Sequence, residues 1–117
     1  MHEHISFGAY IKAVRIRLKI SQRDLAERAD IDFTYLSKIE NGKMSPPSEE
    51  TIRKIAKVLD EDPENLIILA DKIPSNYKEV LQSSPTVPML LRTISQLTNI
   101  NKEKLLEKAI EDLRKQE

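Results

Sequence analysis

The chain has 117 residues, and its 19 Lys and Arg residues balance 19 Asp and Glu residues, so the formal net charge is zero. With 39% hydrophobic and 32% charged residues, no apolar run near the roughly 18 residues of a membrane span and no cysteine, the sequence excludes a disordered chain, a transmembrane helix, disulfides and thiolate metal sites. Only two glycines and five aromatic residues (three Tyr and two Phe) disfavour a β-sandwich or barrel, which leaves an all-α protein that we expect to be cytoplasmic.

The first helix is predicted from an apolar stripe that Ser6 is placed to cap and that ends at Lys19 and Ile20. Its members recur at the spacing i, i+4, i+7 and i+11 of an amphipathic helix, at Phe7, Ile11, Val14 and Leu18. Ser21 opens a second helix of about two turns. Its buried side is expected to consist of Leu25, Ala26 and Ala29.

A third helix follows a break at residues 30–32. Asp32 is placed to cap this helix, which runs to about Glu40. Asn41 and Gly42 end it, because both residue types tolerate the left-handed backbone that follows a helix. Residues 43–47 then form an extended loop. Ser48 caps a fourth helix, whose apolar face is expected at Ile52, Ile55, Ala56 and Leu59.

A fifth helix is predicted where Asp62 precedes Pro63, because proline is favoured at the first helical position. Leu66 and Leu69 are its expected core residues. Five short helices sharing one core therefore make a five-helix domain over residues 6–72.

Residues 73–117 form a helical C-terminal extension. A short helix is interrupted at residues 84–88, a second runs from Met89 to Leu97, and Asn101 is placed to cap the last one. The extension has too many large apolar residues for a solvated linker, so it packs on the first domain, on a second copy or on another protein. We favour dimerisation, through Ile67, Ile68, Leu91, Ile94, Leu106, Ile110 and Leu113.

Charge is distributed unevenly along the neutral chain. Residues 10–43 carry eight basic and five acidic side chains, whereas residues 46–71 carry three basic and seven acidic ones. The distribution favours an anionic partner on one side, although mixed charge is also typical of an ordinary solvated surface.

The segment from Ser21 to Gly42 is a two-turn helix, a tight turn and a second short helix that ends in Asn-Gly. The sequence of Ile20–Ala29 followed by Tyr35–Lys43 resembles the lambda-repressor-like, XRE-type helix-turn-helix family. The resemblance covers roughly residues 6–72 and implies a five-helix DNA-binding domain. Asp30 departs from the family, which most often has glycine in this turn, but aspartate can adopt the required positive φ.

The resemblance implies that the third helix lies in the major groove of double-stranded DNA and reads base edges. At 100° per residue, Phe33, Ile39 and Glu40 fall within about 60° of Leu36 and face the core. The base-reading candidates are Phe33, Thr34, Ser37 and Lys38. For Phe33 two roles stay open, a core contact and a contact with a thymine methyl group.

Other members of the motif are expected to hold the DNA backbone or the fold. By resemblance, Gln22 and Arg23 contact phosphate at the start of the second helix. The remaining phosphate candidates are Tyr35, Asn41 and Lys43. The resemblance also implies that Arg15 and Glu40 form a partly buried structural ion pair.

The function that the resemblance implies is a sequence-specific transcriptional regulator, most simply a repressor that binds a palindromic operator as a homodimer. Two alternatives stay open. One is the antitoxin of a toxin–antitoxin pair, or a related protein with a regulatory peptidase partner. The other is a protein–protein adaptor that does not bind DNA. We expect no catalytic residue, no cofactor and no metal site, because the only histidines are His2 and His4 near the chain start.

Overall fold

The computed structural model describes residues 5–98 and 100–116, and within these ranges the chain is all-α, as the sequence predicts. It divides into two compact units, Met1–Tyr77 and Lys78–Glu117, with the division lying after the boundary expected at residue 72. None of the helices in the described ranges has the length and apolar content that crossing a bilayer requires. The helices are α1 (Phe7–Arg17), α2 (Gln22–Arg28), α3 (Phe33–Glu40), α4 (Glu49–Leu59), α5 (Pro63–Leu69), α6 (Ser75–Gln82), α7 (Thr86–Ser95) and α8 (Lys102–Arg114).

Helices α1–α5 begin where the sequence places their caps. The Ser6 hydroxyl accepts a hydrogen bond from the Ala9 N–H at 3.2 Å. The Asp32 carboxylate accepts one from the Tyr35 N–H at 3.0 Å. Equivalent cap bonds to Ser21, Ser48 and Asp62 start α2, α4 and α5. Such short-range bonds satisfy backbone N–H groups that have no partner inside the helix.

All five of these helices also end alike. Each is followed by one residue with left-handed backbone, and the next N–H bonds back across the last turn, as Ile31 does to Ala26 at 2.9 Å. Asp30 has φ 56°, which confirms that aspartate takes the place of glycine in this turn. The left-handed residues are Lys19, Asp30, Gly42, Asp60 and Asp71.

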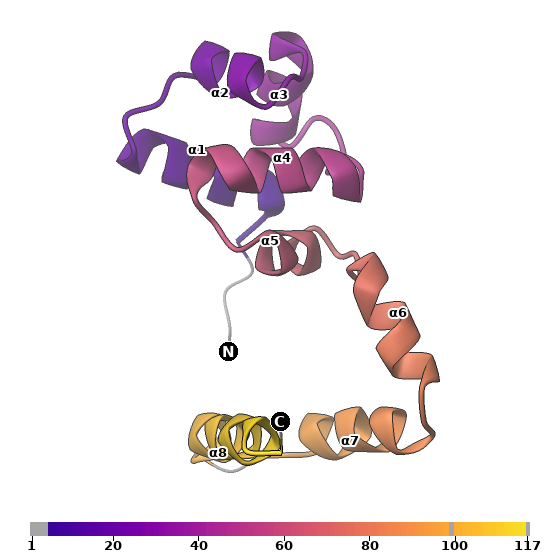
Figure 1. The fold of residues 1–117 in the computed structure, drawn as a ribbon. Helices are drawn as coiled ribbons and strands as arrows, with labels where there is room; N and C mark the ends of the chain where they lie inside the picture. Colours follow the sequence, from indigo (N-terminus) through magenta and orange to yellow (C-terminus); the bar gives the residue numbers. More distant parts are fainter. Residues whose placement is uncertain (1–4, 99, 117) are drawn as a thin grey trace. The chain divides into compact units, whose positions relative to one another are not determined.

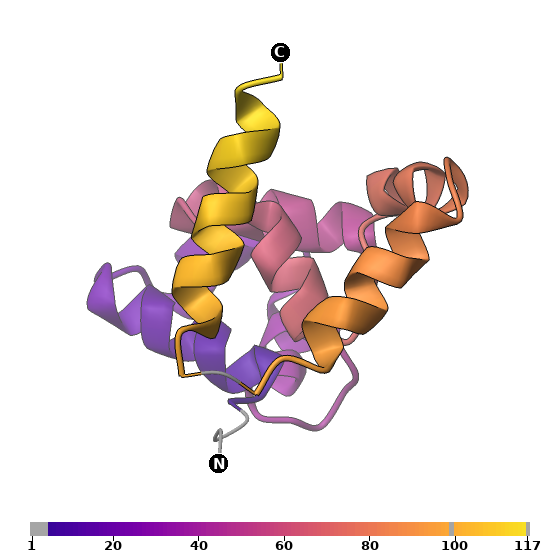
Figure 2. The same cartoon turned by 90° about the horizontal axis from the view of Figure 1, so that it is seen from below.

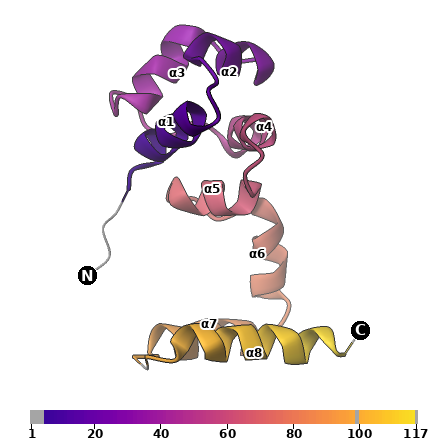
Figure 3. The same cartoon turned by 90° about the vertical axis from the view of Figure 1, so that its left-hand side faces the viewer.

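The core of the first unit is built from the apolar faces of α1–α5. Figures 1 and 3 show α2 and α3 at one end of the unit and α5 at the other, with α1 and α4 between them. Two sequence expectations are wrong here. Leu18, the last position of the predicted stripe and the C-cap residue of α1, is 42% exposed. Ile67 is fully buried between the helices of this core, so it offers no dimerisation surface, whereas Ile68 is exposed.

A close approach of two backbones seats α3 on α1. A Cβ atom added at Gly8 would lie 2.0 Å from the Ile39 carbonyl oxygen. No side chain fits at that distance, so the glycine permits a contact that brings α1 against the end of α3.

The second unit contains α7 and α8, and none of its described residues is buried. Helix α7 begins at Thr86, earlier than predicted, because Pro88 lies within the first turn, where a missing N–H costs no hydrogen bond. Figure 2 shows α7 and α8 as two arms that diverge. Between them runs an apolar groove of about 440 Å³, lined by Leu90, Thr93, Ile94, Leu97, Leu105, Leu106, Ala109, Ile110 and Leu113.

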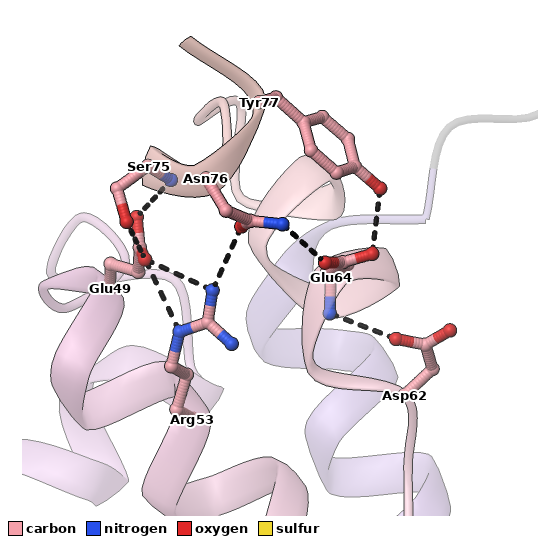
Figure 4. A network of polar contacts seen from close by, with 7 residues as sticks. All are labelled: Glu49, Arg53, Asp62, Glu64, Ser75, Asn76 and Tyr77. Carbon is pink, nitrogen blue, oxygen red and sulfur yellow. Dashed lines mark hydrogen bonds and ion pairs between the residues drawn. The ribbon is translucent and has the colours of Figure 1, made fainter. Parts of the chain in front are cut away.

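Polar contacts hold the first turn of α6 against α4 (Figure 4). Glu49 accepts hydrogen bonds from the Ser75 N–H at 3.0 Å and from the Ser75 hydroxyl at 2.8 Å. Arg53, one turn further along α4, pairs with the same carboxylate at 3.1 Å. Its guanidinium also donates to the Asn76 side-chain oxygen at 3.4 Å.

Glu64 extends these contacts to α5. Its carboxylate accepts a hydrogen bond from the Tyr77 hydroxyl at 2.7 Å and another from the Asn76 amide at 2.9 Å (Figure 4). The chain that leaves α5 is therefore tied to the first unit through three consecutive residues. This α6 anchor consists of Glu49, Arg53, Glu64, Ser75, Asn76 and Tyr77.

The hydrogen bond between Tyr77 and Glu64 moves the pKa of both groups. The Tyr77 hydroxyl, followed by the Asn76 amide, lowers the pKa of Glu64 below its ordinary 4.5. The same bond raises the pKa of Tyr77 above its ordinary 10.0. Because the pKa of Glu64 is lowered, its contribution to the stability of the anchor is fully present above pH 4.5. Because the pKa of Tyr77 is raised, its contribution is fully present below pH 10.0. The pair is therefore fully formed between these two pH values.

Glu64→Ala is expected to return the pKa of Tyr77 toward 10.0, because it removes the acceptor and its negative charge. The measurement is an NMR titration of the tyrosine rings. Tyr10 is an internal control, since its pKa is raised by a hydrogen bond to Glu61. It should stay raised in Glu64→Ala and fall only in Glu61→Ala. An unchanged Tyr77 titration in Glu64→Ala would contradict the anchor.

Candidate nucleic-acid interface

The outward face of α3 is a polar stripe. Thr34, Lys38 and Asn41 are exposed and follow one another at the helical spacing i, i+4, i+7. The opposite face is buried, with Leu36, Ile39 and Glu40 packed inside the first unit, as the 100° geometry predicts. The side chains between the two faces are half-buried: Phe33, Tyr35 and Ser37.

A buried ion pair fixes the end of α3 to α1. The Arg15 guanidinium makes two hydrogen bonds of 2.9 Å to Glu40, one to each carboxylate oxygen. A third N–H of the same guanidinium donates to the Ile20 carbonyl at 2.9 Å. Arg15 is 9% exposed and Glu40 5%, so neither is available to DNA. The planar fork of arginine matches the carboxylate in a way that lysine does not.

Gln22 joins this ion pair from the start of α2. Its side-chain amide donates to Glu40 at 2.9 Å, and the residue is half-buried. The amide N–H₂ that the sequence assigns to phosphate is thus engaged within the protein. Glu40 in this way links α1, α2 and α3 through one carboxylate.

Arg23, the next residue of α2, is exposed and lies over the ring of Phe33. The guanidinium carbon is 4.5 Å from the ring centroid, within the range of a cation–π contact. Phe33 also packs against the core, so its ring is held between the core and Arg23. This contact was not foreseen from the sequence, because it depends on the packing of α2 against α3 and not on residue spacing.

The loop after α3 carries the last two phosphate candidates. The N–H groups of Lys43 and Met44 both bond to the Lys38 carbonyl, at 2.8 Å and 3.3 Å. The loop therefore folds back on α3, with Asn41 and Lys43 exposed at its start. The first unit thus presents Arg23, Lys38 and Lys43 as exposed cations around the outward face of α3. His2 and His4, the two histidines considered for a metal site, lie outside the described residues.

The dimerisation candidates of the C-terminal extension divide in two. Ile94, Leu106, Ile110 and Leu113 line the groove between α7 and α8. Leu91 is 49% exposed but is not among the lining residues. The groove is therefore a second surface of different character, because it is apolar whereas the outward face of α3 is polar and basic.

Comparison with known proteins gives consistent results. A family profile described as Helix-turn-helix matches residues 11–71. Over 78 residues the chain is 36% identical to RghRB of Bacillus subtilis, described as an uncharacterized HTH-type transcriptional regulator, covering 67% of this chain and 56% of that protein. The HTH-type transcriptional repressor RghR of the same organism is 37% identical over 46% of this chain and 40% of its own length. The chain thus spans about half the length of these relatives.

One solved structure matches nearly the whole chain. It is a complex of the SinR protein with the SinI protein, 25% identical, with a TM-score of 0.52, covering 95% of this chain and 99% of the matched one. The profile match covers more than half of the 117 residues. The chain therefore belongs to the helix-turn-helix family, which confirms the XRE-type resemblance carried by its sequence.

Arg15→Met is expected to lower the free energy of unfolding by about 3–5 kcal/mol, because it leaves the Glu40 carboxylate buried without its counter-ion. Urea denaturation of the full chain measures the loss. Arg28→Met is the matched control, because its pair with Asp24 at 3.5 Å is about half exposed and is expected to contribute under about 1 kcal/mol. Equal losses in the two variants would show that burial of the Arg15–Glu40 pair has no energetic role.

Proposed function

We propose that this protein binds double-stranded DNA and regulates transcription, with α3 as the helix that enters the major groove. The observation that carries the proposal is the polar face of α3, held rigidly by the buried Arg15–Glu40 pair. A helix of eight residues is marginal in water by itself, so its packing decides how it is presented. The face is preformed, which lowers the cost of ordering it on DNA.

The side chains of this face fit two kinds of contact. Lys38 can donate to the O6 and N7 acceptors of guanine, and the Thr34 and Ser37 hydroxyls suit either bases or phosphate. Asn41 and Lys43, at the start of the following loop, are placed to hold the backbone. Tyr35 and Gln22 are half-buried at the edge of this face. The Tyr35 hydroxyl and the second amide N–H of Gln22 are the groups that could donate to a DNA phosphate.

We further propose that the protein acts as a homodimer, with a second copy covering the groove between α7 and α8. The two helices bury none of their described residues, and the groove lining is apolar apart from Thr93. Charged side chains pair on α8, as Lys108 with Asp112 and Lys115 with Glu111, and leave the apolar stripe unpaired. A two-fold dimer pairs the same surface of both copies, so an uncovered apolar groove on each copy is a surface that such a dimer could bury.

A dimer suits the role of a repressor on a palindromic operator, since two copies of α3 would read half-sites about one turn of DNA apart. The RghR relative is described as a transcriptional repressor, and the SinR structure is a complex between two different proteins. The SinR complex therefore supports an alternative occupant of the groove, which is a helix of another protein such as a toxin or a regulatory partner.

Selection from a random DNA pool at two salt concentrations is expected to yield a palindrome with half-sites about 10 base pairs apart. Lys38→Ala and Thr34→Ala should each weaken the selected site about 10- to 100-fold, by removing a contact of about 1–3 kcal/mol. Lys54→Ala is the matched control, because Lys54 is an exposed lysine of α4 that lies beside Arg28 and Asp30 and does not belong to the outward face of α3. Contacts with DNA phosphates are strongest at low salt. Negligible binding even at low salt would therefore favour the adaptor alternative.

Ile94→Asp is expected to weaken self-association by more than about 100-fold, because it places a carboxylate in an apolar interface. Sedimentation equilibrium of the 13.5 kDa chain measures this. Ser95→Asp is the control, since it introduces the same charge one residue along, at an exposed position outside the groove. A wild-type chain that stays monomeric at high concentration would leave the groove to another protein.

A further inference from the structure

We propose that Arg23 reads a guanine in the major groove and that Phe33 is the platform that presents it. This inference rests on the proposed function and changes the roles expected from the sequence. Those roles are a phosphate contact for Arg23 and, for Phe33, either a core contact or a contact with a thymine methyl group. The observation behind it is the cation–π contact between the two residues, with the guanidinium carbon 4.5 Å from the ring centroid.

In the arrangement that we propose, the plane of the guanidinium lies over the ring of Phe33. Such a guanidinium directs its N–H groups sideways, past the rim of the ring. The same edge is what arginine uses to donate two parallel hydrogen bonds to guanine O6 and N7. Phe33 therefore holds the group that suits guanine in the orientation that guanine needs.

Arg23 is also not engaged by an acidic side chain. Within residues 5–98 and 100–116, no carboxylate lies within ion-pair distance of its guanidinium, and the neighbouring Asp24 pairs with Arg28 at 3.5 Å. An ion pair would cap the edge of the guanidinium and raise the cost of moving it to DNA. The cation–π contact leaves that edge available to a ligand.

Phe33 is itself fixed by three features of the chain. It is the first residue of α3, its ring packs against the core, and the preceding Asp32 caps the helix by accepting from the Tyr35 N–H. It also precedes Thr34, the first member of the exposed polar stripe. The guanidinium edge is thus presented at the end of α3 where that stripe begins.

Guanine is favoured over phosphate by the way in which Arg23 is held. A phosphate contact tolerates many side-chain conformations, because the phosphate is a nearly spherical charge that long flexible cations reach from several directions. Bidentate contact with a base edge requires one plane and one direction. A flexible arginine side chain loses conformational entropy when it binds DNA. Holding Arg23 in place before binding reduces this loss, and the reduction favours most the bidentate contact, which requires a fixed plane.

The test begins with the site that the wild-type chain selects, using the full chain. Arg23→Ala is expected to make one guanine of each half-site degenerate in the selected pool and to weaken that site about 10- to 100-fold. Replacing this guanine by 7-deazaguanine removes the N7 acceptor. We expect the replacement to weaken the wild type about tenfold and to change Arg23→Ala less than about twofold.

Two further variants isolate the stack. Phe33→Leu keeps an apolar side chain against the core but removes the ring, and it should lose the preference for the same guanine while the rest of the motif survives. Arg28→Ala is the control, because it removes an arginine of α2 that does not touch Phe33, and it should leave the preference unchanged. Thermal melting of each variant establishes that it is folded at the binding temperature.

Three results would overturn the inference. Arg23→Ala could weaken all DNA sequences equally and lower the salt dependence by about one ion, which is the signature of a phosphate contact. It could leave the guanine preference intact. Phe33→Leu could retain that preference, which would remove the platform role. Failure of the proposed function looks different, because then the wild-type chain itself selects no motif.

Discussion

The buried carboxylate of Glu40 is the constraint on which the proposed DNA-binding face of the first unit depends. It accepts two hydrogen bonds from Arg15 of α1 and one from Gln22 of α2, while the guanidinium of Arg15 reaches the loop between those helices at Ile20. One side chain at the end of α3 thus determines the positions of three elements. A buried ion pair often adds little net stability compared with an apolar core of the same shape. Its specific hydrogen-bond geometry, in contrast, allows only one arrangement of α3, and that is the property a reading helix needs.

Local signals explain why much of the first unit could be predicted from the sequence. Caps such as Ser6 and Asp32 act over three residues, and the apolar period of 3.6 residues places Leu36 and Ile39 inside without knowledge of the partner helix. The same reasoning failed at Ile67, because the spacing within α5 does not reveal how many neighbours surround a helix. Ile67 is buried on a side of α5 for which the sequence pattern predicted no core contact.

The unforeseen contacts all join residues that are distant in the sequence or depend on how two helices pack. Glu49 binds Ser75 across 26 positions, and Arg23 meets Phe33 only because α2 and α3 pack at a particular angle. Propensity and periodicity carry no information about such pairs. The family resemblance did not supply them either, because it assigned Arg23 by the position of the motif and not by its surroundings. These long-range contacts therefore needed coordinates, whereas the fold class did not.

The two units are stabilised by different means, and this has a consequence for regulation. The first has a continuous core and capped helices, so it is expected to fold by itself. The second has helices of 10 and 13 residues with no buried side chain in the described residues, and isolated helices of that length are marginal in water. An occupant of the groove between α7 and α8 would therefore contribute to the order of these helices. Under the proposed dimer, the folding of these helices and association are one equilibrium, so protein concentration would control both. A competing apolar helix would then act on DNA binding without touching α3, by removing the second copy that the operator requires.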